Sequence, residues 1–165
     1  HGVMVPMVSD EESAWQAVRR STYPPAGQRS IGGYRAQFSF GMARDTYLAD
    51  ASNFIEVWVQ IEDRTAVENA EAIARVPGVT GLFIGPQDLA ASLGLTPTLE
   101  PASREFDDAL DHLLAATARS GCPLGILVPD LASARHRADQ GFRIIAVGSD
   151  ARILTTGGAD LIAGL

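Results

Sequence analysis

Two acidic side chains follow two successive apolar runs at a spacing that would suit a shared metal ion. Glu62 ends the run that begins at Val57, and Asp88 follows the next run one strand–helix unit further along the chain. Acids at the carboxyl ends of neighbouring parallel strands meet at one edge of a sheet. Two carboxylates plus waters suit Mg²⁺ or Mn²⁺, but helix capping would explain the same acids. The spacing alone leaves both interpretations open.

The segment that carries Asp88 has a second possible role. Gly85 permits a close backbone approach, and Pro86 suits the first turn of a short helix. The free N–H groups at such a helix start could hold a carboxylate or a phosphate. An ordinary helix start after a strand explains this segment equally well.

These residues depend on a series of short apolar runs that alternate with amphipathic segments. Most of the runs are continuously apolar, which is typical of parallel strands covered on both faces. The predicted strands are Val3–Val8, Phe54–Ile61, Thr80–Ile84, Pro123–Val128 and Arg143–Val147, and the predicted helices are Asp10–Ser21, Asp63–Arg75, Pro101–Ser120, Leu131–Gln140 and Ala151–Leu165. This order predicts an α/β fold with a parallel sheet, either open and doubly wound or part of a barrel.

Two further features refine this expectation. No Gly-x-Gly-x-x-Gly turn follows the first run, where Asp10, Glu11 and Glu12 would repel a pyrophosphate, so a dinucleotide site is disfavoured. The stretch from Tyr23 to about Ala51 is rich in turn residues at its start and is much longer than a usual connection. We interpret it as a long loop, a kind of segment that is often functional.

Composition narrows the function classes. The formal charge of −7 argues against a nucleic-acid surface, which needs clustered cations, and no apolar run approaches the roughly 20 residues of a membrane span. Cys122 is the single cysteine, which precludes an internal disulfide and suits a reducing cytoplasm, and it is expected to be a small buried side chain. A complete (β/α)₈ barrel needs about 250 residues. With 165 residues and an apolar run at its start, the chain is expected to belong to a longer polypeptide.

Five motifs in register resemble the HpcH/HpaI aldolase family, typified by 4-hydroxy-2-oxoheptanedioate aldolase. The resemblance spans essentially the whole chain. The motifs are Val5-Pro6-Met7-Val8, Tyr23-Pro24-Pro25-Ala26-Gly27-x-Arg29, Gln60-Ile61-Glu62, Phe83-Ile84-Gly85-Pro86-x-Asp88-Leu89 and Ala146-Val147-Gly148-x-Asp150. The resemblance implies a (β/α)₈ TIM barrel in which residues 1–165 form the C-terminal part of one domain, about the last five strand–helix units.

The resemblance also implies a set of site residues. Glu62 and Asp88 would bind a divalent cation, Mg²⁺, Mn²⁺ or Co²⁺, which pyruvate would chelate through its keto and carboxylate oxygens. The Gly85–Asp88 backbone, including the amides of Gln87 and Asp88, would hold the pyruvate carboxylate. Arg29 would either face the active site or brace its own loop. Leu127 would pack against the pyruvate methyl group or belong to the barrel core.

A general base is not assigned. In the family a His and an Arg come from early strands, and no residue of this chain matches them. His1 precedes the first predicted strand, and His112 and His136 fall in predicted helices, where a solvated position is expected. All 13 basic residues are arginines, so a Schiff-base lysine, and with it a class I aldolase, is excluded.

The expected function is a class II aldolase that reversibly cleaves 4-hydroxy-2-oxo acids to pyruvate and an aldehyde. Its partners would be small molecules, namely pyruvate, other 2-oxo acids and aldehydes. A citryl-CoA- or malyl-CoA-type lyase is an alternative in the same superfamily. Another is a catalytically incomplete fragment that acts only through assembly. Relatives use their C-terminal helices to form oligomers, so the helix from Ala151 is expected to pack on another copy.

Overall fold

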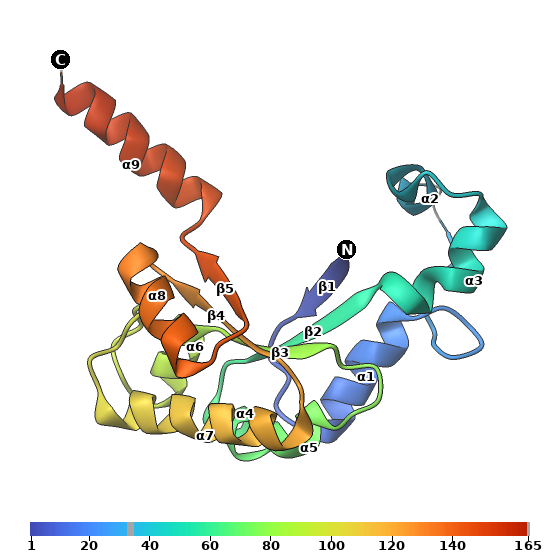
Figure 1. Cartoon of the computed structure of the whole chain (residues 1–165), viewed down its shortest axis with the longest axis horizontal. Helices are drawn as coiled ribbons and strands as arrows, with labels where there is room; N and C mark the ends of the chain where they lie inside the picture. The colour runs from blue at the N-terminus through green and yellow to red at the C-terminus, as the bar shows by residue number, and fades with distance from the viewer. Residues whose placement is uncertain (33–34, 165) are drawn as a thin grey trace.

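The computed structural model describes residues 1–32 and 35–164 and contains one parallel sheet. Its strands are hydrogen-bonded to one another in chain order, and all four pairings are parallel. They are β1 (Gly2–Val5), β2 (Glu56–Ile61), β3 (Gly81–Ile84), β4 (Leu124–Val128) and β5 (Ile144–Val147). The sheet is curled, and most of the helices lie along its convex side (Figure 1). Strands in chain order with return helices on one side form a segment of a barrel wall.

The helices of the described residues differ in length and in the part they play. They are α1 (Glu11–Ser21), α2 (Arg35–Phe40), α3 (Arg44–Phe54), α4 (Arg64–Glu68), α5 (Ala70–Ala74), α6 (Pro86–Ser92), α7 (Arg104–Ser120), α8 (Leu131–Gln140) and α9 (Asp150–Ala163). Asp10 and Asp63 cap α1 and α4 through hydrogen bonds to Ser13 N and Ala66 N. Gly121 and Gly141 end α7 and α8 with φ values of 73° and 109°, in the left-handed region where glycine is favoured.

The predicted strands and most predicted helices are confirmed, with shifted boundaries. β1 ends at Val5 instead of Val8, and the predicted helix from Asp63 is divided into α4 and α5 at Asn69. The prediction of a loop between Tyr23 and Ala51 is wrong over its second half, which contains α2 and α3. Residues 33–34 of that loop, and the predicted end of the last helix at Leu165, lie outside the described residues.

Apolar side chains of the helix α3 pack against aromatic rings from other segments. Tyr47, Ala51 and Phe54 follow one another at intervals of four and three residues, and Tyr47 and Ala51 are buried. The ring of Phe40 lies 5.4 Å from that of Tyr47 and 4.8 Å from that of Phe54, measured between ring centroids. Tyr23 packs edge-on against Tyr47. This aromatic cluster packs α3 against the rest of the segment. The turn-rich composition at the start of the segment gave no sign of that packing.

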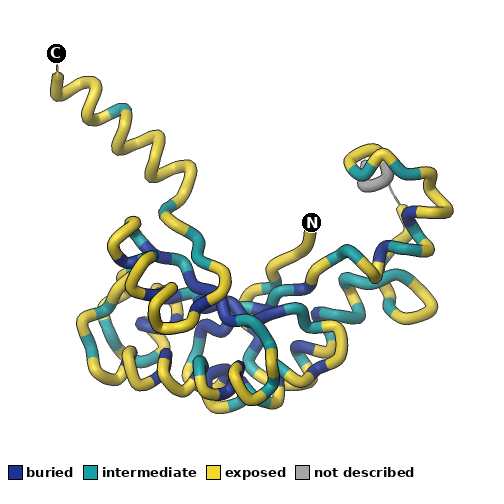
Figure 2. Tube along the Cα trace, viewed as in Figure 1, coloured by how far each residue is buried: buried dark blue, intermediate teal, exposed yellow. Residues whose placement is uncertain are grey.

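The hydrophobic core lies between the convex side of the sheet and the helices (Figure 2). Alternate strand residues such as Val59, Leu82 and Ile126 are fully buried there. The long helix α7 contributes Phe106, Leu110 and Leu113, its largest fully buried side chains. Because successive strand residues point to opposite faces, the residues between the core positions point to the concave side, the interior of the barrel.

Glycines on the concave side make room for large side chains from the neighbouring strand. Trp58 on β2 pairs in register with Gly81 on β3, and Phe83 on β3 pairs with Gly125 on β4. A Cβ atom on Gly81 would overlap the Trp58 ring, and one on Gly125 would lie 2.6 Å from the Phe83 ring. Each large ring therefore lies over a glycine one strand away.

Two parts of the described chain leave apolar surface exposed. The outer strands β1 and β5 have partners on one side only, and Met4 and Ile144 on them are 45% and 46% exposed. The helix α9 contains no buried residue and leads away from the rest of the molecule (Figures 1 and 2). Within residues 1–32 and 35–164, no helix combines the length and the apolar character that crossing a membrane requires.

The glycine packing gives a testable expectation. Gly81→Ala should destabilise the fold by about 1–3 kcal/mol, because its methyl group would overlap the Trp58 ring. The double variant Gly81→Ala, Trp58→Leu should lose less unfolding free energy than the sum of the losses in the two single variants. Denaturant unfolding of the wild type, both single variants and the double variant measures the coupling. Strict additivity would contradict this packing.

Candidate functional site

Glu62 occupies the carboxyl end of β2 on the concave side and is only 5% exposed. Each of its carboxylate oxygens accepts one hydrogen bond. The backbone N–H of Met7 donates to Oε2 at 2.9 Å, and the Nε2 amide of Gln60 donates to Oε1 at 3.0 Å. Gly85 lies against the same carboxylate, since a Cβ atom on it would overlap Oε1. The side chain is therefore held on several sides by the protein.

The electrostatic surroundings of Glu62 favour its protonated form. Burial raises the pKa of the carboxyl group, and the nearby charges of Asp88 and Asp63 raise it further. The hydrogen bond from the Met7 N–H lowers it, and this acts against the burial. A cation placed among these acids would offset the charge repulsion and favour the ionised carboxylate.

Asp88 lies on the first turn of α6, the helix whose N-cap residue Gly85 lies against the Glu62 carboxylate. Gly85 is the N-cap, Pro86 is the first helical residue and is buried, and Gln87 and Asp88 are exposed. The first turn of a helix has N–H groups with no partner within the helix. Because the charge of Asp88 acts on Glu62, the two carboxylates belong to one electrostatic group. The structure thus brings Glu62 and the Gly85–Asp88 segment to the same edge of the sheet.

Leu127 lies in line with these residues on the adjacent strand. The register pairs Ile61 with Ile84 and Ile84 with Ile126. One residue further along each strand, Glu62, Gly85 and Leu127 therefore form a row across β2, β3 and β4. Leu127 is half-buried and shares its side of β4 with Gly125, whereas Ile126 and Val128 are buried among the core residues. The position fits an apolar wall beside the acids.

Arg29 contacts residues of its own loop. Its N–H donates to the carbonyl of Thr22 at the C-terminal end of α1, and its guanidinium lies 4.7 Å from the centroid of the Tyr23 ring. The helix α1 starts near the Glu62 edge, and its 11 residues carry the chain about 16 Å away from it. These contacts support the bracing of its own loop, and an active-site role for Arg29 stays a prediction.

The donor set fits a hard divalent cation. Within the described ranges 1–32 and 35–164, no cluster of three or more His, Cys, Asp or Glu side chains is arranged to hold a metal. Two carboxylates are sufficient for Mg²⁺, which usually keeps several of its waters. The buried, hydrogen-bonded carboxylate of Glu62 beside the exposed Asp88 provides such a pair. A soft metal that prefers Cys or His ligands has no such partners here.

The histidines lie away from Glu62. His112 and His136 are exposed on helices α7 and α8, as expected from the sequence. The ring of His1 packs against Phe40 at 4.3 Å, and the carbonyl of His1 accepts from Glu56 N at the start of β2, the opposite end of that strand from Glu62. None of the three is placed as a general base for this site.

Two contacts of Glu62 were missed at the level of sequence. Gln60 precedes Glu62 by two residues and therefore shares its face of the strand, a signal that was available. Met7 lies more than 50 residues away in the chain and reaches Glu62 through its backbone. The position of its N–H depends on the path of the loop after β1, which side-chain patterns do not encode.

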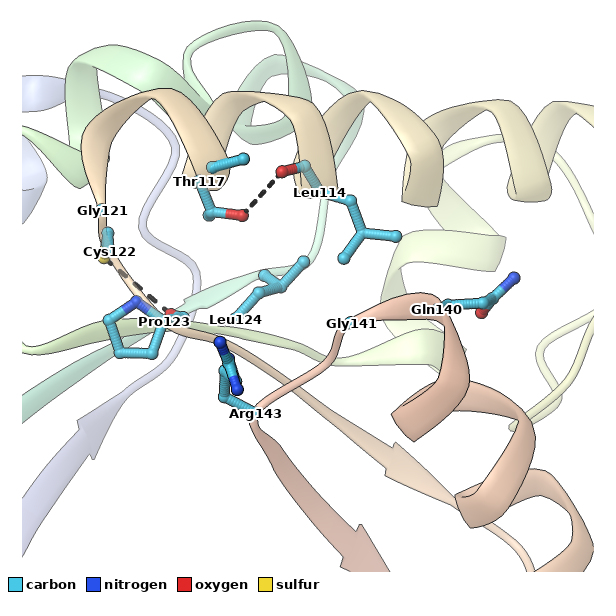
Figure 3. A pocket seen from close by; sticks show the side chains of 10 residues that line it. Leu114, Thr117, Gly121, Cys122, Pro123, Leu124, Gln140, Gly141 and Arg143 are labelled. Carbon is cyan, nitrogen blue, oxygen red and sulfur yellow. Dashed lines mark hydrogen bonds between the residues drawn. The ribbon is translucent and has the colours of Figure 1, made fainter.

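A separate cavity of about 530 Å³ lies at the other end of the sheet (Figure 3). It opens between the C-terminal ends of α7 and α8, where Leu114, Leu124 and Arg143 are among its lining residues. Cys122 is half-buried in its wall, and burial raises the pKa of its thiol, in keeping with a packing role. No acidic residue lines the cavity, so it is distinct from the Glu62 site.

Comparisons with known proteins identify the family and the fold of this chain. The family model described as "HpcH/HpaI aldolase/citrate lyase" matches residues 1–156. A 5-keto-4-deoxy-D-glucarate aldolase of Klebsiella pneumoniae is 42% identical over 151 residues, which cover 91% of this chain and 57% of that protein. A hydroxypyruvate/pyruvate aldolase of Chromohalobacter salexigens is 41% identical over 152 residues, which cover 92% of this chain and 59% of that protein.

A solved structure gives the same result at the level of the fold. The crystal structure of an HpcH/HpaI aldolase/citrate lyase family protein from Burkholderia cenocepacia superposes with a TM-score of 0.86 and 35% identity, covering 99% of this chain and 64% of that one. The chain thus spans less than two thirds of these relatives. The predicted barrel architecture is confirmed as a curled half-barrel of five parallel strands. On the family match and these relatives together, the chain belongs to the HpcH/HpaI aldolase/citrate lyase family.

Proposed function

We propose that this chain carries the metal- and pyruvate-binding edge of a class II aldolase that cleaves 4-hydroxy-2-oxo acids to pyruvate and an aldehyde. The observation on which this rests is the buried Glu62 carboxylate, held by Met7 and Gln60 next to Asp88 at the carboxyl edge of the sheet. The names of the relatives support the substrate class, since they include an aldolase for a keto-deoxy sugar acid and one for hydroxypyruvate and pyruvate.

Each residue of this edge has a distinct task in the proposed mechanism. Glu62 and Asp88 hold Mg²⁺, Mn²⁺ or Co²⁺. The N–H groups of Gln87 and Asp88 donate to the pyruvate carboxylate, and Gly85 and Pro86 place that turn close to it. Leu127 lines the methyl side. When bound, the cation supplies Lewis-acid stabilisation of the charge that develops on the 2-oxo oxygen during C3–C4 cleavage.

The remaining parts of the site come from elsewhere in the assembled protein. The described residues offer no histidine beside Glu62, and we infer that the proton-transfer group is a bound water or a residue outside them. We infer that further strand–helix units close the barrel into one domain, because β1 and β5 leave unpaired edges and relatives extend well beyond the matched region. With a single cysteine, the chain suits a reducing cytoplasm.

We also infer that α9 packs on a second copy of this chain. Its residues 153, 154, 157, 158, 161 and 162 recur at intervals of four and make one apolar face with two central glycines. Ile153, Leu154, Leu161 and Ile162 are 67–78% exposed. The helix leads away from the sheet instead of turning back along it (Figure 1). The helix α9 therefore lies outside the barrel that further strands would complete, and its apolar face is free to contact another copy.

The metal ligands can be tested directly. In the intact polypeptide, Glu62→Gln and Asp88→Asn should each weaken Mn²⁺ binding by more than about 100-fold, because even outer-shell changes commonly cost 10–100-fold. Calorimetric titration with Mn²⁺ measures affinity, and a coupled assay measures pyruvate release from a 4-hydroxy-2-oxo acid. Asp111→Asn, on the exposed side of α7, is the matched control.

The outcomes separate the alternatives. Mn²⁺ affinity that is unchanged in either variant would refute the assignment of ligands. Metal-dependent cleavage of a citryl-CoA or malyl-CoA thioester without aldol cleavage would instead identify the lyase alternative.

The buried charge of Glu62 should reduce stability when no metal is bound. A carboxyl group with a raised pKa in the folded state binds its proton more tightly there, so stability falls as the pH rises through the unfolded value and on toward the raised one. That loss persists at higher pH. Glu62→Gln should therefore unfold a few degrees higher than the wild type at pH 7 with a chelator present, since ~1 kcal/mol corresponds to about 2–4 °C at this size.

Scanning calorimetry at two pH values checks the sign. The difference should shrink below pH 4.5, the ordinary value for this group, where both states are protonated in the wild type. If Glu62→Gln instead unfolds at a lower temperature than the wild type at pH 7 without metal, the charge of the Glu62 carboxylate does not destabilise the fold.

Assembly through α9 has its own measurement. The double variant Leu154→Asp, Leu161→Asp should shift the protein to a smaller species in light scattering, because two charges would be buried in the interface. Ala159→Asp, on the opposite side of the helix, should leave the mass unchanged. A wild-type protein that is monomeric at micromolar concentration would exclude this interface.

A further inference from the structure

The loop between β1 and α1 contains an unusual backbone conformation next to the candidate metal ligand. Met7 has φ of 55°, and among the described residues it is the one residue other than glycine with positive φ. Residues other than Gly, Asn and Asp rarely adopt this backbone conformation. Such residues persist where the surroundings determine the backbone, and they gather at functional sites.

The side chain of Met7 does not explain this conformation. It is 58% exposed, so little packing holds it in place. The contact that the conformation produces is instead made by the backbone, whose N–H donates to Oε2 of Glu62 at 2.9 Å. The backbone hydrogen bond is therefore the feature that the loop geometry preserves.

Both sides of Met7 are fixed by other contacts. On its C-terminal side, Val8 is buried and its N–H donates to the carbonyl of Gln60 at 3.3 Å. Ser9 Oγ donates to the carboxylate of Asp63, and the amide of Asn69 donates to the Ser9 carbonyl at 2.9 Å. On its N-terminal side, Val5 pairs with Val59 in β2. The loop is thus attached to the residues on both sides of Glu62.

We propose that Met7 is a positioning residue whose left-handed backbone sets the orientation of the Glu62 carboxylate for the cation shared with Asp88. The proposal rests on the function proposed above for Glu62. Each carboxylate oxygen has two lone pairs, and the Met7 N–H occupies one on Oε2 while Gln60 occupies one on Oε1. The carboxylate is thereby fixed in place, and a lone pair on each oxygen remains for the cation. Outer-shell contacts of this kind orient metal ligands.

Substitutions at Met7 can separate the backbone from the side chain. Met7→Gly and Met7→Asn remove the thioether but accept the left-handed conformation readily. Met7→Val and Met7→Ala resist it, the β-branched valine most strongly. If the backbone positions Glu62, Met7→Gly and Met7→Asn should bind Mn²⁺ within about threefold of the wild-type affinity in the intact polypeptide. Met7→Val should bind it about 10–100-fold more weakly, and Met7→Ala should lie between them.

The measurements are Mn²⁺ titration calorimetry and hydrogen exchange of the Met7 amide. Exchange at this amide should be slow in the wild type and in Met7→Asn, and faster in Met7→Ala, Met7→Val and Glu62→Gln. Met4→Val, an exposed methionine on β1 with ordinary backbone, is the matched control and should bind Mn²⁺ as the wild type does. Should the valine variant fail to fold, the comparison of alanine with asparagine carries the same test.

Two results would overturn the inference while leaving the proposed function intact. One is equal Mn²⁺ affinity in all Met7 variants while Glu62→Gln loses binding, and the other is a loss for Gly and Asn as large as that for Val, which would assign the role to the side chain. If instead the wild type binds no Mn²⁺, or Glu62→Gln binds it as tightly, the proposed function fails and this inference fails with it.

Discussion

The burial of the Glu62 carboxylate at the carboxyl edge of the sheet is the constraint on which the site depends. A charged group out of contact with water needs hydrogen bonds or an opposite charge, and here the protein provides one hydrogen bond to each oxygen. Neither Met7 nor Gln60 carries a charge, so they stabilise the carboxylate only in part, and its pKa remains raised. In the proposed site, a bound cation would supply the positive charge that these contacts lack.

The position of the Glu62 carboxylate also depends on how side chains pack on the concave side of the sheet. Glu62 can lie flat against β3 because position 85 has no side chain, just as Trp58 lies over Gly81 and Phe83 over Gly125. In all three pairs the glycine is one strand further along the chain than the large side chain. The Glu62 carboxylate therefore occupies a place in the barrel interior that is built in the same way as the apolar layers.

Much of this arrangement could be predicted from the sequence, for identifiable reasons. Continuous apolar runs gave the strands, and capping residues such as Asp10 and Asp63 gave helix starts, because these signals are local. The pairing of Glu62 with the Gly85–Asp88 segment could be predicted because parallel strands end at one edge. The position of α3 could not, since it depends on an aromatic cluster assembled from segments separated in the sequence. The contact from Met7 depends on a backbone angle, which residue type alone does not reveal.

The chain-order pairing of the strands has a consequence for how the protein is made. β2 pairs with β3, and β4 with β5, across short connections, whereas β1 must wait for the whole α2–α3 segment before β2 appears. During translation at roughly 5–20 residues per second, β1 and α1 leave the ribosome seconds before their partner strand exists. Over that interval the edge of β1 that β2 later covers has no partner strand. This interval ends when β2 has been translated and pairs with β1. The same pairing brings Glu62 to the loop after β1, whose backbone hydrogen-bonds its carboxylate.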